Sequence, residues 1–186
     1  MRRFLLSIFA AAAVVSAACS DPNDLPDATV ANFVDTVTLA ALTGTPIADA
    51  SAFSISGGDS VRTDLSSDFD FAFQLDAEKG AMLLPRAVLG LTGVGRSDAG
   101  LQRRDETFDE IDTGESDGYV TSDTVFIAVG ERYMGRSRVV CSALGVSKYG
   151  KLEILAIDPV NRLVTFRYLV NDNCGYTGLL PGLPEE

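Results

Sequence analysis

The chain has 186 residues, with 15 basic and 26 acidic side chains and no histidine, and its net charge is −11. This length suits a single ordinary domain, and the excess of acid argues against nucleic-acid binding because it repels phosphate backbones. The lack of histidine excludes Ser-His-Asp and Cys-His catalysis and histidine metal sites, so we expect neither an enzyme nor a resident metal.

Residues 1–18 have the pattern of a secretory signal peptide. Arg2 and Arg3 give the start a positive charge, and a nearly unbroken apolar run follows from Phe4 to Val15. This run is too short to cross a bilayer as a helix, and small residues come after it. The segment therefore predicts export to the cell envelope.

The tetrapeptide Ser16-Ala17-Ala18-Cys19 resembles the lipobox of bacterial lipoproteins, in which the cysteine becomes the lipidated first residue. Ser16 departs from the aliphatic residue that this family usually carries, and Ser20 resembles the outer-membrane sorting pattern. The resemblance implies a membrane anchor through a lipid on Cys19, at the outer membrane, facing the periplasm or the surface. Ordinary signal-peptide cleavage is the alternative.

Residues 19–30 are rich in Pro and Asp without a periodic pattern, which predicts a lipid-anchored tether. A single all-β domain is predicted over 31–180, with a tail at 181–186. Period-two alternation of apolar residues supports it, most clearly in Asp68–Leu75, whose phenylalanines share one face and whose Asp68, Asp70 and Gln74 share the other. The other predicted strands are Thr36–Leu42, Ala52–Ser56, Ala81–Leu84, Ala87–Leu91, Thr124–Val129, Arg132–Cys141, Lys151–Ile157 and Leu163–Asn171.

These strands predict an antiparallel β-sandwich or partly open barrel of about eight or nine short strands. Asp158-Pro159-Val160-Asn161-Arg162 has the composition of a hairpin loop and joins the last two. The one helix that we expect is short, at Asp105–Ile111.

Cys141 and Cys174 are predicted to form a disulfide, because the exported compartment is oxidising and Cys19 is assigned to lipid. The bond would close a loop of about 34 residues and stabilise the fold by about 3.8 kcal/mol in the chain-entropy model. A redox or metal pair is the alternative.

An acidic cluster lies in residues 105–117. Its members are Asp105, Glu106, Asp109, Glu110, Asp112, Glu115 and Asp117. A solvated loop is the simplest interpretation; a cation site and a catalytic carboxylate pair are the alternatives.

Arg132, Met134, Arg136 and Arg138 are predicted to share one face of a strand, opposite Tyr133 and Val139. Three arginines on one face repel each other unless anions offset them. Their partner is either the acidic loop, through salt bridges, or an anionic ligand that suits guanidinium groups.

Phe69-Asp70-Phe71-Ala72-Phe73 resembles the W-D-x-A-F strand of HmuY-type haem-binding lipoproteins, with Phe69 at the Trp position. Tyr149-Gly150-Lys151-Leu152 and Val164-Thr165-Phe166-Arg167-Tyr168 are similar to that family's closing hairpin, so the similarity covers residues 60 to 170. The resemblance implies a β-rich fold that holds haem between two axial side chains. Haem-binding members use histidines, so Met82 and Met134 would be the candidates here.

The sequence thus predicts a non-enzymatic envelope lipoprotein that binds a ligand or partner or has a structural role. Binding of haem or another anionic ligand is the second hypothesis, and a carboxylate-dependent hydrolase is the third.

Overall fold

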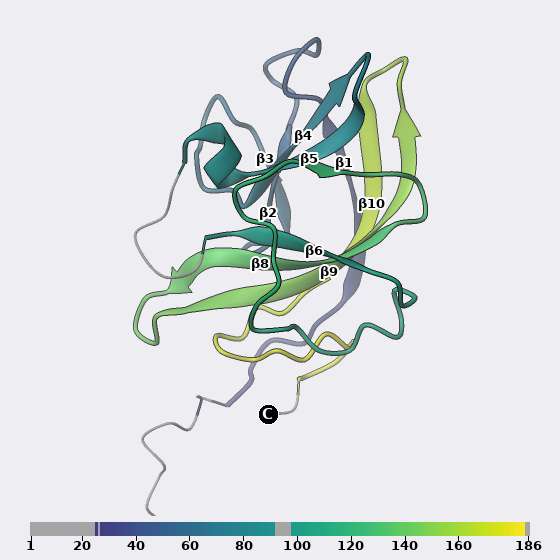
Figure 1. The fold of residues 1–186 in the computed structure, drawn as a ribbon. Helices are drawn as coiled ribbons and strands as arrows, with labels where there is room; N and C mark the ends of the chain where they lie inside the picture. The colour runs from purple at the N-terminus through teal and green to yellow at the C-terminus, as the bar shows by residue number, and fades with distance from the viewer. Residues whose placement is uncertain (1–24, 26, 92–97, 185–186) are drawn as a thin grey trace, which may run out of the picture.

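The computed structural model describes residues 25, 27–91 and 98–184, so the signal segment and Cys19 lie outside the described residues. Two five-stranded sheets form the molecule, a first sheet in the order β1-β10-β9-β8-β6 and a second in the order β3-β2-β4-β5-β7 (Figure 1). Every pairing of neighbouring strands is antiparallel. The predicted all-β antiparallel sandwich is confirmed, in its open rather than its barrel form.

The described residues contain ten strands, one or two more than predicted. They are β1 (Val34–Ala40), β2 (Ala52–Ser54), β3 (Asp59–Val61), β4 (Phe71–Asp76), β5 (Gly80–Pro85), β6 (Gly100–Arg104), β7 (Val125–Phe126), β8 (Arg132–Cys141), β9 (Val146–Asp158) and β10 (Leu163–Val170). The sequence prediction missed β3 and β6, which carry little apolar alternation. No described helix is long and apolar enough to cross a membrane.

The strand predicted at Ala87–Leu91 is wrong. The chain there forms the short 3-10 helix η1 (Arg86–Leu89), which ends at Gly90 with a φ of 77°. Pro85 has no N–H for a further strand pairing, and the N–H groups of Gly90 and Leu91 donate to carbonyl oxygens of the same turn. The apolar run therefore turns back on itself instead of extending.

Aromatic side chains of both sheets meet in the interior of the sandwich. The ring of Phe53 on β2 lies 5.3 Å from that of Phe166 and 4.8 Å from that of Tyr168, both on β10. Phe71 and Phe73 are also fully buried there, as the alternation predicted. Burial of one such side chain stabilises the fold by about 1.5–3 kcal/mol, so this cluster is the main apolar contribution to the sandwich.

Asp70 contradicts the predicted alternation, because it lies in the interior and not on the solvent side with Asp68 and Gln74. The chain bends at Asp70 and β4 begins only at Phe71, so the period of two is broken there. For the same reason Phe69 packs with Ala72 outside the main core. The alternation of residue types is visible in the sequence, but the bend of the backbone at Asp70 is not.

The Asp70 carboxylate connects the two sheets. One oxygen accepts the backbone N–H of Ile55 at 2.7 Å and of Ser56 at 3.3 Å, just after β2. The other accepts the backbone N–H of Arg138 on β8 at 2.8 Å and its guanidinium at 3.3 Å. Burial raises the pKa of the Asp70 carboxyl, and these donors act in the opposite direction.

A bulge in β8 makes this link geometrically accessible. The register between β8 and β9 shifts between Arg136 and Val139, so the backbone of Arg138 turns away from β9. The Ser137 hydroxyl accepts the N–H of Lys148 at 2.9 Å and donates to the Arg138 carbonyl at 2.6 Å. The extra residue of the bulge is thereby held in position to meet Asp70.

Replacing Asp70 by Ala should lower the free energy of unfolding by about 3–5 kcal/mol, because three backbone N–H groups, which are buried or partly buried, and a guanidinium lose their acceptor. Urea titration of the purified mature protein measures this. The matched control is Asp68→Ala, since the side chain of Asp68 is 80% exposed and meets Arg138 only at 3.4 Å. Equal, small losses for both variants would contradict a central role for Asp70.

Candidate functional site

The four residues predicted to form a ligand face on β8 do not all lie together. Met134 is on the outer face of the first sheet, in a cluster separate from the inter-sheet core that contains Tyr133. Arg132 and Arg136 share this outer face. Arg138 does not, because the bulge directs its guanidinium to Asp70 and Asp68. The strict alternation that predicted four residues on one face ends at Arg136.

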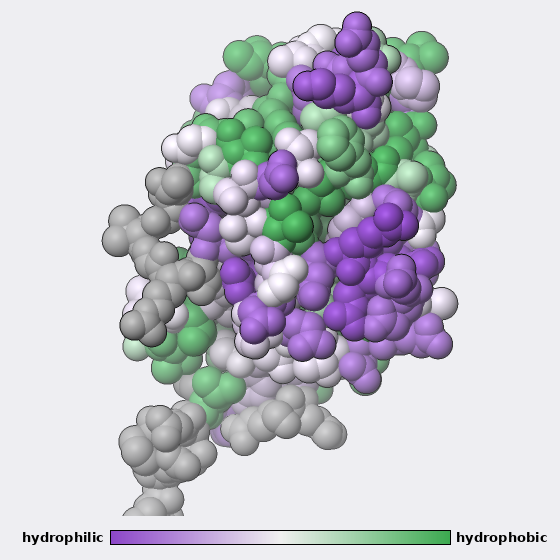
Figure 2. Space-filling model, in the orientation of Figure 1, coloured by the Kyte–Doolittle hydropathy of each residue, from purple (hydrophilic) through white to green (hydrophobic). Residues whose placement is uncertain are grey.

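The outer face is covered by a segment of the same chain, residues 105–121, which we call the acidic strap. It leaves the end of β6 and crosses the sheet (Figure 1), and Figure 2 shows hydrophilic side chains gathered in one large patch on this face. Phe108 and Ile111 point inward from the strap and are buried with Met134 and two leucines. The strap is therefore packed against the sheet through an apolar contact of its own.

The helix predicted at Asp105–Ile111 is wrong, because the strap makes only one turn. Glu110 closes that turn by accepting the N–H of Thr107 at 2.9 Å and its hydroxyl at 2.7 Å. The carbonyl oxygens of Phe108 and Ile111, which a longer helix would use internally, accept hydrogen bonds from Lys151 on β9 instead. The lysine thus ends the turn.

Lys151 is the residue of this site that the sequence analysis missed. It is 2% exposed, and its Nζ donates to Phe108 at 2.7 Å and to Ile111 at 2.8 Å. Burial lowers the pKa of the Lys151 amine, while the charges of Asp109 and Asp112 act against that shift. A lysine within an apolar strand was the only signal in the sequence.

Phe108 is held between two cations. The Lys151 Nζ lies 4.6 Å from the centre of its ring, and the Arg167 guanidinium lies 4.3 Å from it. Arg167 also donates to Glu153 at 2.5 Å, and Glu153 lies opposite Arg132 in the register of β8 and β9. Cation–π contact and this interposed carboxylate reduce the repulsion that neighbouring cations on one sheet face would otherwise create.

Arg132 and Arg136 contact the acidic strap, which one of the two hypotheses named as their partner, but not through the salt bridges that it predicted. They reach its carbonyl oxygens, with Arg132 donating to Asp105 at 3.2 Å and Arg136 to Ser116 at 2.7 Å. The Arg136 guanidinium also lies 4.7 Å from the centre of the Tyr119 ring. Among the described residues, the ion pairs to the strap come from Arg104, which contacts Glu106 and, at 3.8 Å, Glu115.

The carboxylates of the strap point to solvent or lie at its edge. The hydrogen bond from Arg104 lowers the pKa of Glu106 to about 2, and the bonds from Thr107 lower that of Glu110. The general acid of a glycoside hydrolase needs a raised pKa, so the shifts of Glu106 and Glu110 are opposite to the one that this role requires. Among the described residues, no group of three or more Cys, Asp or Glu side chains is arranged to hold a metal ion.

The two methionines considered for haem lie on opposite outer faces of the sandwich. Ala81 and Leu83, the neighbours of Met82 on β5, belong to the inter-sheet core, so Met82 points away from it. Met134 points away from the core on the other sheet and is fully buried beneath the strap. A haem with both methionines as axial ligands does not fit this arrangement.

The described surface has shallow hollows away from these residues. One of about 360 Å³ is lined by Asp112 and the C-terminal segment, including Leu180 and Leu183. Another, of about 410 Å³, lies beside the disulfide and includes Leu144. Neither is lined by Met134 or by the arginines of β8. These two hollows are therefore separate from the predicted ligand face on β8.

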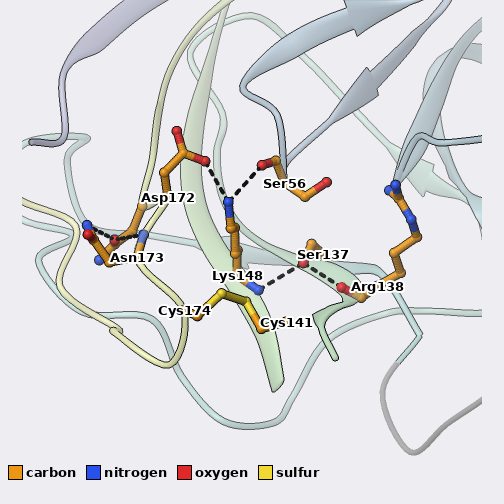
Figure 3. The surroundings of a disulfide bond; sticks show 9 residues. Ser56, Ser137, Arg138, Cys141, Lys148, Asp172, Asn173 and Cys174 are labelled. Carbon is orange, nitrogen blue, oxygen red and sulfur yellow. Dashed lines mark hydrogen bonds and ion pairs between the residues drawn. A yellow bond between two sulfur atoms is a disulfide. The ribbon is translucent and has the colours of Figure 1, made fainter. Parts of the chain in front are cut away.

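Cys141 and Cys174 form the predicted disulfide, with their Cα atoms 5.8 Å apart. It joins the end of β8 to the C-terminal segment, and Figure 3 shows Lys148 bridging the two sheets beside it. The Lys148 Nζ donates to the Ser56 carbonyl at 3.1 Å and to the Asp172 carboxylate at 2.9 Å. This region is a structural junction between the two sheets and the C-terminal segment.

Comparisons with protein-family models, with curated proteins and with solved structures found no match for this chain. The resemblance of residues 60 to 170 to HmuY-type lipoproteins stays a prediction.

Replacing Lys151 by Met should loosen the acidic strap while the sandwich stays folded, because two buried carbonyl groups lose their donor at a cost of about 1–3 kcal/mol. Amide hydrogen exchange at Ile111 and Gly114, whose N–H groups are hydrogen-bonded, should become about tenfold faster or more. Lys79→Met, in the exposed turn between β4 and β5, is the control. Unchanged exchange in K151M would show that the other contacts of the strap hold it without Lys151.

Proposed function

We propose that this chain is a non-enzymatic lipoprotein of the cell envelope, anchored through a lipid on Cys19, whose β-sandwich binds a partner or has a structural role. The observation that carries the proposal is the disulfide. Cys141 and Cys174 are bonded to each other, which leaves Cys19 as the unpaired cysteine. That cysteine follows the apolar leader directly, where lipoproteins carry the modified residue.

The disulfide also supports the envelope location, since such bonds form and persist in oxidising compartments. A location at the outer membrane is the more specific part of the proposal and rests on Ser20 alone.

The non-enzymatic role is supported by how the charged side chains are used. Arg132, Arg136 and Lys151 of the first sheet contact the chain's own strap. Hydrogen bonds lower the pKa of two strap carboxyls, those of Glu106 and Glu110. Charged side chains that bind other parts of the same chain stabilise its structure. Catalysis usually needs polar groups that converge on a pocket.

Replacing Cys19 by Ser should abolish lipid attachment completely. The test is metabolic labelling with a fatty acid in a bacterial host, together with the mass of the mature N-terminus. Ser20→Ala is the control and should label like the parent chain. A mature parent chain that is cleaved, unlabelled and soluble in the periplasm would establish ordinary signal-peptide cleavage instead.

Binding of haem or another anionic ligand is the second hypothesis. Its support is that the Nε atoms of Arg132 and Arg136 are buried without a partner in the structure. The burial of Met134 and the opposite position of Met82 act against haem itself.

Titration of the mature protein with haemin should therefore leave the Soret band at the position of free haemin. Measurement in the presence and absence of the protein, with a histidine-ligated haem protein as positive control, decides this. A saturable shift that Met134→Leu removes would contradict the expectation and would restore the haem hypothesis.

A further inference from the structure

The chain enters and leaves the sandwich at one end, which we call the base (Figure 1). Leu25 lies against Gly175, where any Cβ would clash with it. The side chain of Asn173 accepts the N–H groups of Thr29 and Val30 at 2.9 and 3.0 Å. Asn32 then pairs with Gly182 in an antiparallel bridge. The base is thus built from both ends of the described chain.

Five large apolar side chains of the base are exposed to solvent. Their exposed fractions are 42% for Val30, 62% for Phe33, 44% for Val34, 52% for Leu180 and 61% for Leu183. The pairing of Asn32 with Gly182 brings the two segments that carry them next to each other. Scattered exposed apolar residues need no explanation, whereas a group of them at one end marks an interaction surface.

The distance along the chain to Cys19 indicates what covers this surface. Six residue steps separate Cys19 from Leu25, so a fully extended chain would span at most about 20–22 Å. A lipid on Cys19 would therefore keep the base close to the bilayer. The turn that contains Val160 lies at the other end of the sandwich, because β10 runs from Leu163 beside that turn to Val170 at the base.

Charge argues for lipid over a second copy of the chain. Removal of Arg2 and Arg3 with the leader would change the net charge from −11 to −13, so two mature chains repel each other. Exposed Asp27, Asp35 and Asp112 lie near the base, which disfavours anionic lipids as well. Zwitterionic headgroups have no net charge, so they are repelled neither by the net charge of the chain nor by these carboxylates.

We propose that the base docks on the zwitterionic headgroup region of the bilayer, with Phe33, Leu180 and Leu183 at the boundary of the acyl chains. This inference rests on the proposed lipid anchor, which supplies a high local concentration of membrane for a surface that binds weakly on its own. The sandwich then stands on the membrane, with the loop at Val160 directed away from it.

The chain contains no tryptophan, so one introduced tryptophan reports its own surroundings. We would compare Phe33→Trp with Val160→Trp, both in the mature chain from residue 19 with the disulfide intact. The free thiol of Cys19 would be coupled chemically to a maleimide lipid in phosphatidylcholine vesicles, with and without bromine on the acyl chains. Chemical coupling makes the anchor independent of lipidation in a cell.

The emission of F33W should move to shorter wavelength and be quenched about twofold by the brominated lipid, because interfacial side chains lie about 5–10 Å into the headgroup/acyl boundary. The emission of V160W should not change. Replacing Leu180 and Leu183 by Ser in the F33W chain should reduce the quenching. The matched control is Leu155→Ser, at a β9 position that is 43% exposed.

Unchanged emission of coupled F33W would overturn the docking proposal, whatever the labelling experiment on Cys19 shows. A blue shift of uncoupled F33W that grows with protein concentration, without vesicles, would also overturn it and would identify a second copy as the occupant. Failure of lipid labelling in cells, with F33W quenched after coupling, would instead remove the anchor proposal alone.

Discussion

The contact between the Asp70 carboxylate and the bulge of β8 fixes how the two sheets meet. Apolar packing of phenylalanines is strong but not directional, so it allows neighbouring arrangements of one sheet on the other. A buried carboxylate that must satisfy three N–H groups and a guanidinium allows only one, because any displacement would leave charged or polar groups unpaired. Ile55 directly follows β2 of the second sheet and Arg138 lies on β8 of the first. This one side chain therefore fixes the position of one sheet on the other.

The outer face illustrates how an acidic chain can cover a basic sheet surface largely through carbonyl oxygens and aromatic rings, with ion pairs to the strap only from Arg104 among the described residues. The strap offers carbonyl oxygens and the two aromatic rings of Phe108 and Tyr119 to the cations below it, and most of its carboxylates are exposed to water. This arrangement avoids the desolvation of carboxylates, which is the largest cost of a buried ion pair. It also explains why Lys151 tolerates burial, since two carbonyl groups and a ring replace much of its hydration.

The sequence predicted well those features that follow from regular alternation. The whole of β8 and the burial of Phe71 and Phe73 needed only the period of two, and the disulfide needed only the number and context of the cysteines. The prediction failed wherever the backbone departs from that period. The bend at Asp70 reversed the side on which Phe69 and Asp70 lie, and the bulge after Arg136 removed Arg138 from the predicted ligand face. Lys151 was missed because its partners are carbonyl groups of a distant segment, which leave no mark on the residue types.

The C-terminal segment contacts three separate parts of the molecule. It is bonded to β8 through Cys174, to the strap through the N–H of Leu179 and to the N-terminal segment through Asn173 and Gly182. Because the segment has little regular structure of its own, its position depends on the disulfide, which restricts the unfolded chain and holds the segment against the sheet. A reducing compartment would leave these contacts without their covalent support. Because Cys174 directly follows Asn173, which binds the N-terminal segment, the disulfide stabilises the base, and this support exists only in an oxidising environment.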